Sequence, residues 1–185
     1  LPVILEKLKT KYRIRRIILV ADRGIIEKGN IAALREAKME FILGMRLWSM
    51  TKAWQAEVIG TKKFRALKKD GSLLMREMDY RGDRLIVTWS QKRATRDAAI
   101  REDLIRKIRE RLDKDDVEPK EFITHKGYKQ FLKGLDKGTP ELNEAAIELS
   151  KKRDGFFGVL TNVPAELMSG EDIHARYKDL WHVED

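Results

Sequence analysis

Two carboxylates stand at positions where the sequence could bind a metal ion or do acid–base chemistry. The first is Asp22, which directly follows the five apolar residues 17–21 and precedes Gly24. In α/β proteins, ligand and metal sites lie at the carboxyl ends of parallel strands, so an aspartate here is a candidate metal ligand. A strand-ending aspartate that only forms a turn or caps a helix is the commoner case, and that alternative stays open.

Glu184 is the second candidate, because helical geometry places it in an apolar stripe. At about 100° per residue, the side chains of Ile173, Tyr177, Leu180 and Glu184 fall on one side of a helix. A carboxylate that faces a core is costly unless it is paired, protonated or bound to a metal. The alternative is that the helix frays near residue 185 and leaves Glu184 exposed, and the two readings carry equal weight.

Other residue types offer little chemistry. The three histidines, His125, His174 and His182, have no metal-ligand spacing beside a carboxylate on the same face. The glycines form neither a dinucleotide fingerprint nor a phosphate loop. Without cysteine there is no thiol nucleophile, thiolate metal site or disulfide, which fits a reducing cytosol.

The elements that must position Asp22 begin with a strand–helix–strand unit. Residues 13–22 predict a central strand buried on both faces. Asn30 is expected to cap a short helix, and residues 40–47 predict the next strand. Connections this short imply that the two strands are parallel.

Further elements are expected after residue 47. Residues 48–90 predict short antiparallel strands, and Thr95 is expected to cap a long amphipathic helix. Thr139 and Pro140 predict a helix start, and residues 156–161 predict a strand. Ser169 is expected to cap the last helix.

Aromatic residues are interleaved with Lys and Arg between residues 48 and 89. Such a pattern could stack on nucleic acid, but a small β-rich segment also needs a core of its own, and both readings carry equal weight. The aromatic residues are Trp48, Trp54, Phe64, Tyr80 and Trp89.

The charge balance points to a polyanionic partner. The 185 residues hold 39 Lys and Arg against 30 Asp and Glu, a formal charge of +9, and 42% are hydrophobic. Six bases and no acid lie within residues 7–16, just before the strand that ends at Asp22. No run approaches the ~20 apolar residues of a membrane span, and no signal peptide is recognisable. We therefore expect a soluble intracellular protein whose most common kind of partner is nucleic acid.

Several of these motifs together resemble the DDE transposases of bacterial insertion sequences. The resemblance covers nearly the whole chain and is greatest to the group whose RNase H-like core is interrupted by a β-rich insertion before the last acid. It implies an α/β fold in which a partial RNase H-like catalytic core is interrupted by a mixed β/α insertion. The matching stretches are Val20–Gly24, Asn30–Ile31, Phe41–Gly44, Arg84–Val87, Arg93–Ala94, Asp154–Phe157, Thr161–Asn162 and Tyr177–Glu184.

The resemblance also implies a division of the chain. Residues 1–47 would form the first part of the core. Residues 48–138 would form the insertion, β-rich and then helical. Residues 139–185 would return to the core and carry the final catalytic helix.

The family signature Tyr-x2-Arg-x3-Glu-x6-Lys assigns site residues by resemblance. Tyr177 and Glu184 fit it, whereas Leu180 occupies the arginine position. Asp22 matches the second catalytic aspartate and Glu184 the catalytic glutamate, and both would be metal ligands. The first catalytic aspartate has no match in residues 1–185.

Three bases of the run before Asp22 are expected to contact DNA. These bases are Arg13, Arg15 and Arg16. Tyr177 of the signature is expected to contact DNA as well. The family's site holds two Mg²⁺ or Mn²⁺ ions, for which hard carboxylate oxygens are suited.

The implied function is DNA cleavage and strand transfer at element ends by a two-metal mechanism. Double-stranded DNA would be both element end and target, no membrane would be involved, and a homodimer in the active complex is one option. The location would be the cytoplasm, associated with the nucleoid. Both ends look cut, so this chain is expected to be an incomplete fragment, inactive alone. A non-catalytic DNA-binding remnant and another RNase H-like nuclease remain as alternatives.

Overall fold

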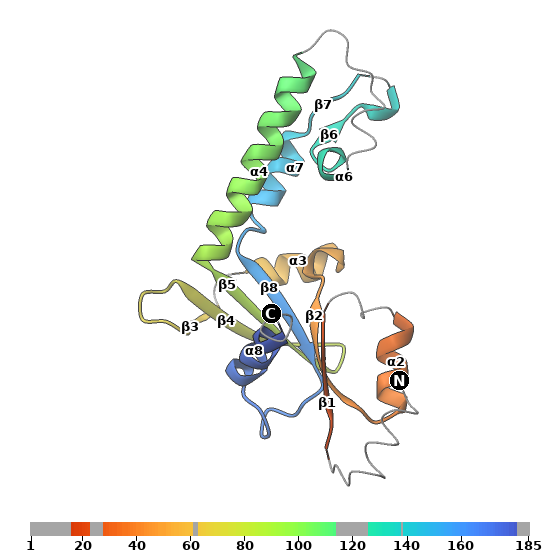
Figure 1. Cartoon of the computed structure of the whole chain (residues 1–185), viewed down its shortest axis with the longest axis vertical. Coiled ribbons are helices and arrows are strands. Elements are labelled where there is room, and N and C mark those ends of the chain that lie inside the picture. The colour runs from red at the N-terminus through yellow and green to blue at the C-terminus, as the bar shows by residue number, and fades with distance from the viewer. Residues whose placement is uncertain (1–15, 23–27, 61–62, 114–125, 138, 181–185) are drawn as a thin grey trace. The chain divides into compact units, whose positions relative to one another are not determined.

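The computed structural model describes residues 16–22, 28–60, 63–113, 126–137 and 139–180 (Figure 1). The chain is a mixed α/β protein that divides into two compact units. The first unit takes the residues up to Leu67, Leu74–Thr88 and the residues from Phe157 onward. The second takes Lys68–Leu73 and Trp89–Phe156. None of the described helices is both long and apolar enough to cross a membrane.

The first unit is built on a six-stranded mixed sheet with the strand order β1-β2-β8-β5-β4-β3 (Figure 1). Its strands are β1 (Ile18–Ala21), β2 (Glu40–Met45), β3 (Arg65–Ala66), β4 (Leu73–Tyr80), β5 (Asp83–Ser90) and β8 (Phe156–Thr161). Its helices are α2 (Lys28–Glu36), the 3₁₀ turn η2 (Leu47–Ser49), α3 (Lys52–Ile59) and α8 (Gly170–Asp179).

The predicted parallel pair is confirmed, since β1 and β2 pair in parallel from Ile18 opposite Glu40 to Ala21 opposite Leu43. β8 then pairs antiparallel with β2, which makes the sheet mixed. The prediction that β1 is central and buried on both faces is wrong for the described sheet, where β1 is the first strand in the order. Residues 18–20 are accordingly only half-buried.

One face of this sheet is covered by α8, drawn in dark blue in Figure 1. The apolar stripe predicted for this helix is confirmed, because Ile173 and Tyr177 are fully buried and Leu180 packs against the same core. Ile18 and Val20 of β1 pack against this core as well. Its buried members are Ile42, Met75, Ile86, Val159, Val163, Ile173 and Tyr177.

The other face of the sheet has its own buried side chains. In β2, Phe41 and Leu43 alternate with Ile42 and therefore point away from α8. Leu34 of α2 and Val58 of α3 are buried as well. The chain therefore has apolar side chains on both faces of β2, which fits its position between two neighbouring strands.

The second unit contains the long helix α4 (Gln91–Leu112) and several shorter elements. These are α6 (Lys126–Lys129), β6 (Leu132–Lys133), the 3₁₀ turn η4 (Leu135–Lys137), β7 (Glu141–Leu142) and α7 (Glu144–Lys151). Its core joins Ile105 and Ile108 of α4 to Tyr128, Phe131, Leu132 and Ile147. Ile100 of the same helix is exposed.

Three predicted helix starts differ from the structure. Helix α2 already includes Lys28, so Asn30 lies within it rather than capping it. Ser90, not Thr95, caps α4 by accepting a hydrogen bond from the backbone N–H of Arg93 at 3.2 Å. Helix α7 begins at Glu144, because residues 141–142 pair with β6 first.

Ser169 is the N-cap of α8, as predicted, and its hydroxyl oxygen accepts from the backbone N–H of Asp172 at 3.1 Å. The segment 48–90 contains the expected strands β3, β4 and β5, but also helix α3, which was not expected. These strands belong to the same sheet as β1 and β2. The division at residues 47/48 and 138/139 stays a prediction.

Candidate functional site

Asp22 lies immediately after β1, at the end of a parallel strand, and its side chain is exposed. Ala21, the last residue of β1, is buried, so the chain passes from interior to surface within one residue. The apolar residues that precede Asp22 hold the strand in the sheet through pairing with β2. The sequence therefore presents a carboxylate to solvent on a rigid element, as a ligand site requires.

Tyr177 of α8 contacts this carboxylate. Its phenol donates a hydrogen bond to Oδ1 of Asp22 over 2.8 Å. The tyrosine is fully buried, and its ring lies 5.2 Å from the ring of Phe157, measured between centroids. The structure thus brings together Asp22, predicted as a metal ligand, and Tyr177, predicted as a DNA contact, which lie 155 positions apart in the sequence.

The N-terminal turn of α8 is held by charged side chains. Arg65 of β3 forms an ion pair with Glu171, which lowers the pKa of that carboxyl to about 2. Acidic residues in the first turn also interact favourably with the helix dipole. The helix that carries Tyr177 is therefore fixed at its start to the edge of the sheet.

Arg84 of β5 holds the segment that leads into α8. Its guanidinium donates to the carbonyl oxygens of Val163 at 2.7 Å and Met168 at 3.0 Å. It also contacts both carboxylate oxygens of Glu77, at 2.5 and 3.1 Å. Sequence reasoning missed this role, although Arg84 begins one of the stretches that resemble the family.

Thr161 and Asn162 extend the pairing of β8 with β2 through their side chains. Asn162 accepts from the backbone N–H of Phe41 at 2.8 Å and donates to the carbonyl of Met39 at 2.8 Å. The Thr161 hydroxyl donates to the carbonyl of Phe41 at 2.6 Å. These contacts fix the start of β2, the strand beside Asp22, and give the Thr-Asn motif a structural role.

Of the remaining predicted site residues, Glu184, Arg13 and Arg15 lie outside the described residues. Arg16 is described, and its guanidinium forms an ion pair with Glu40 of β2. The hydrogen bond from the Arg16 guanidinium to the Glu40 carboxylate within this ion pair raises the pKa of Arg16. The predicted DNA contacts of Arg16 and Tyr177 stay predictions, and the structure gives both side chains a partner within the protein.

The donor chemistry at Asp22 fits one ligand of a divalent ion. Its carboxylate oxygens are hard donors of the kind that Mg²⁺ binds, and the side chain is exposed. Among the residues that the structure describes, no group of three or more His, Cys, Asp or Glu side chains could hold a metal ion. Asp22 therefore suits a shared site to which further carboxylates contribute.

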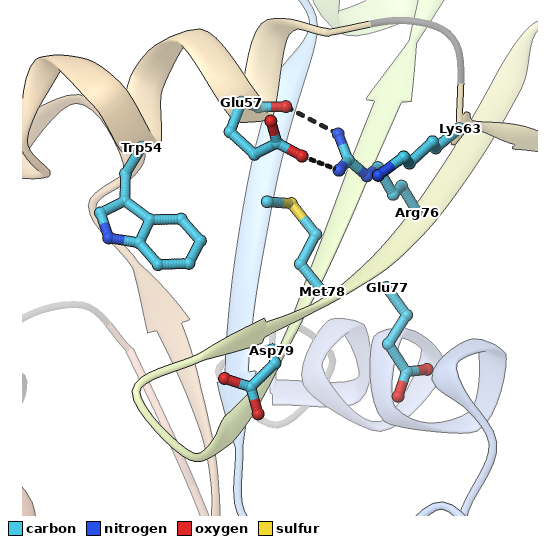
Figure 2. Close-up of a pocket in the computed structure, with 7 residues that line it drawn as sticks. All are labelled: Trp54, Glu57, Lys63, Arg76, Glu77, Met78 and Asp79. Carbon is cyan, nitrogen blue, oxygen red and sulfur yellow. Dashed lines mark hydrogen bonds and ion pairs between the residues drawn. The ribbon is translucent and has the colours of Figure 1, made fainter.

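A hollow in the first unit holds about 390 Å³ (Figure 2). Arg76, which is buried, donates to the carbonyl of Glu57 at 2.7 Å and pairs with the Glu57 carboxylate. This contact lowers the pKa of Glu57. The hollow is lined by Trp54, Glu57, Lys63, Arg76, Glu77, Met78 and Asp79.

The aromatic residues near this hollow pack against one another. Trp54 meets Tyr80 edge to face, with 4.9 Å between ring centroids. Arg81 lies over the Tyr80 ring at 5.3 Å. The ion pair between the buried Arg76 and the exposed Glu57 meanwhile joins β4 to α3. Trp54 and Tyr80 are both only half-buried, so the two interpretations of the aromatic pattern stay open.

A family model described as the transposase DDE domain matches residues 1–185. No curated protein matches the chain. No solved structure matches it either.

Proposed function

The chain belongs to the family of transposase DDE domains, and from this premise we propose that it forms part of a site for DNA cleavage and strand transfer at the ends of a mobile element. Membership of this family implies transposition chemistry, divalent metal ions and DNA binding in general. The assignment of Asp22 and Glu184 as catalytic carboxylates is our proposal. The observation that carries it is the exposed Asp22 at the end of β1, contacted by Tyr177 of the signature helix.

The sheet supports an RNase H-like core as the finer fold. Its parallel pair β1–β2 is followed by the antiparallel strand β8, and a helix then covers the sheet face. On this proposal, the catalytic acids are Asp22, directly after β1, and Glu184, in the sequence that follows α8. The sequence pattern puts Glu184 seven residues after Tyr177, on the stripe that contains Ile173 and Leu180.

Asp22 and Glu184 would hold the divalent ions together with a third carboxylate. This third carboxylate is the family's first catalytic aspartate, which has no counterpart in residues 1–185. When bound, such a pair of ions activates a water or 3′-hydroxyl and stabilises the leaving oxygen of the phosphodiester. This chain's contribution is to present Asp22 to solvent on a rigid strand. Because one acid is unmatched, we propose that this chain alone does not cleave DNA.

The basic surplus supports double-stranded DNA as substrate. The net charge of +9 and the six bases of residues 7–16 favour contact with phosphates. One position departs from this pattern. Leu180 stands where the family signature has arginine, and because a leucine cannot pair with phosphate, this position contributes no phosphate contact. The protein would act at the nucleoid in the cytoplasm, and a homodimeric active complex is one option.

The proposal is tested by strand transfer in the complete transposase that carries these residues. Asp22→Asn and Glu184→Gln should each abolish Mg²⁺-dependent transfer while binding to element ends persists. Asp79→Asn changes an exposed aspartate of the same unit in the same way and should leave transfer unchanged. Undiminished transfer by the Asp22 and Glu184 variants would overturn the site assignment. Retained DNA binding without any transfer in the unmodified protein would favour a non-catalytic remnant.

A further inference from the structure

The geometry points to Tyr177 as a positioning residue that orients the Asp22 carboxylate for metal binding. The inference rests on the proposed function, since it takes Asp22 as a metal ligand. It gives Tyr177 a role different from the DNA contact that the signature suggests. On this account the tyrosine acts through Asp22 and touches neither substrate nor metal.

The first support is the contrast in burial across one hydrogen bond. The Asp22 side chain is exposed, whereas the Tyr177 side chain that donates to it is fully buried. Phe157 packs against the tyrosine ring at 5.2 Å with an interplanar angle of 46°. A ring enclosed by a core has one accessible rotamer, so the phenol oxygen has a fixed position.

The second support is the effect of this fixed donor on the carboxylate. An exposed aspartate samples several χ1 rotamers and a broad range of χ2. The 2.8 Å bond from Tyr177 to Oδ1 favours the orientations that keep this contact, and it thereby restricts the direction of Oδ2. A ligand oriented before the ion arrives loses less conformational freedom on binding. Hydrogen bonds to ligating carboxylates act in this way at other metal sites.

The third support is the way in which the tyrosine itself is held. Ile173, one turn before Tyr177, is fully buried in the same core. Ser169 caps the helix, and Arg65 pairs with Glu171 in its first turn. The phenol is therefore placed by an entire anchored helix rather than by a mobile loop. This is the rigid support that a positioned ligand needs.

A purely structural role predicts a different outcome. In that case the hydrogen bond only satisfies a buried phenol, and its loss would lower stability without changing metal affinity. Tyr177→Phe separates the two, because it keeps the packed ring and removes only the hydroxyl. Tyr128→Phe is the matched control, since Tyr128 is also buried but belongs to the core of the second unit.

The experiment is a Mn²⁺ titration by electron paramagnetic resonance of the complete transposase that carries these residues, with thermal unfolding of each variant. We expect Tyr177→Phe to weaken Mn²⁺ binding by about tenfold, the lower end of such outer-shell effects. Tyr128→Phe should leave the affinity unchanged. An unchanged affinity in folded Tyr177→Phe would overturn the inference.

Asp22→Asn and the double variant separate this inference from the proposed function. Asp22→Asn should lose the same binding, and adding Tyr177→Phe should then have no further effect. If Asp22→Asn weakens binding but Tyr177→Phe does not, the proposed site stands and the positioning role is wrong. If Tyr177→Phe weakens binding equally with and without Asp22→Asn, the tyrosine acts elsewhere and the inference is overturned.

Discussion

Asp22 and Asp154 both lie in stretches that resemble the transposase family, yet their surroundings are opposite. Asp22 is exposed at the end of β1 in the first unit and accepts a hydrogen bond from a neutral phenol. Asp154 follows α7 in the second unit and pairs at 2.5 Å with Arg101, whose side chain is only 7% exposed. The indole N–H of Trp89 also donates to the backbone carbonyl of Asp154 at 3.1 Å.

The difference separates an aspartate that holds the fold from one that is available to a ligand. The charge of Asp154 is neutralised by a buried guanidinium, so a metal ion would have to displace Arg101. The Asp22 side chain is exposed, and it accepts a hydrogen bond from the Tyr177 phenol. Similarity to the family therefore marks both residues, whereas the structure shows that Asp154 is held in a buried ion pair and that Asp22 is exposed at a strand end.

The largest expected effect is on stability, from Asp154→Ala. Removing this carboxylate leaves the buried Arg101 without its ion-pair partner, which typically costs about 3–5 kcal/mol. Urea unfolding would measure the loss. Glu148→Ala breaks an exposed pair with Lys151 in the same unit and should cost only about 0–1 kcal/mol. Equal losses for the two variants would remove the distinction between buried and exposed carboxylates.

Gly155→Ala should give the next largest loss of folding stability. The backbone conformation of this residue alone should cost about 1–3 kcal/mol when it carries a side chain. Gly155 has φ +84°, and a Cβ there would lie 2.6 Å from Nε1 of Trp89. Gly71→Ala is the control, because Gly71 has a similar φ of +69° but open space around its Cβ position. Thermal unfolding should therefore show a larger loss at Gly155 than at Gly71. A smaller or equal loss at Gly155 would show that the turn at Asp154 and Gly155 is not tightly packed against Trp89.

Glu171→Gln should have a smaller effect, about 0–1 kcal/mol, since its pair with Arg65 is exposed. Its pKa is lowered from 4.5 to about 2, so the ionised pair stabilises the folded state above about pH 4.5. That contribution is lost as the pH falls toward 2. The difference in unfolding free energy between the variant and the unmodified chain should accordingly be constant near pH 7 and shrink below pH 4.5. A difference that grows on acidification would contradict the assigned pair.

The positions of β1, β2 and β8 were predictable, because each of these strands is a short, largely apolar run. Residues 156–161 and 40–47 became β8 and β2 with little change, and Ser169 was correctly identified as a cap. Helix starts were less predictable where a competing contact decides them. Asn143, not Thr139, caps α7, since the chain first pairs with β6.

The candidate site was only half predictable. Asp22 was identified from its place after an apolar run, and Tyr177 from its place in a signature. Nothing in the sequence indicates that the two side chains meet, because their contact depends on how α8 packs against the sheet. The same holds for Asn162, whose hydrogen bonds to the start of β2 join residues more than 100 positions apart.

The most direct test of this account compares the Mn²⁺ affinity of the complete transposase with and without Asp22→Asn. Removing the charge of an exposed side chain should change the unfolding free energy by about 0.5 kcal/mol or less. Mn²⁺ binding should nevertheless weaken by about tenfold or more, because a hard, charged ligand is lost. Unchanged Mn²⁺ affinity in a folded Asp22→Asn variant would contradict the claim that Asp22 is a metal ligand.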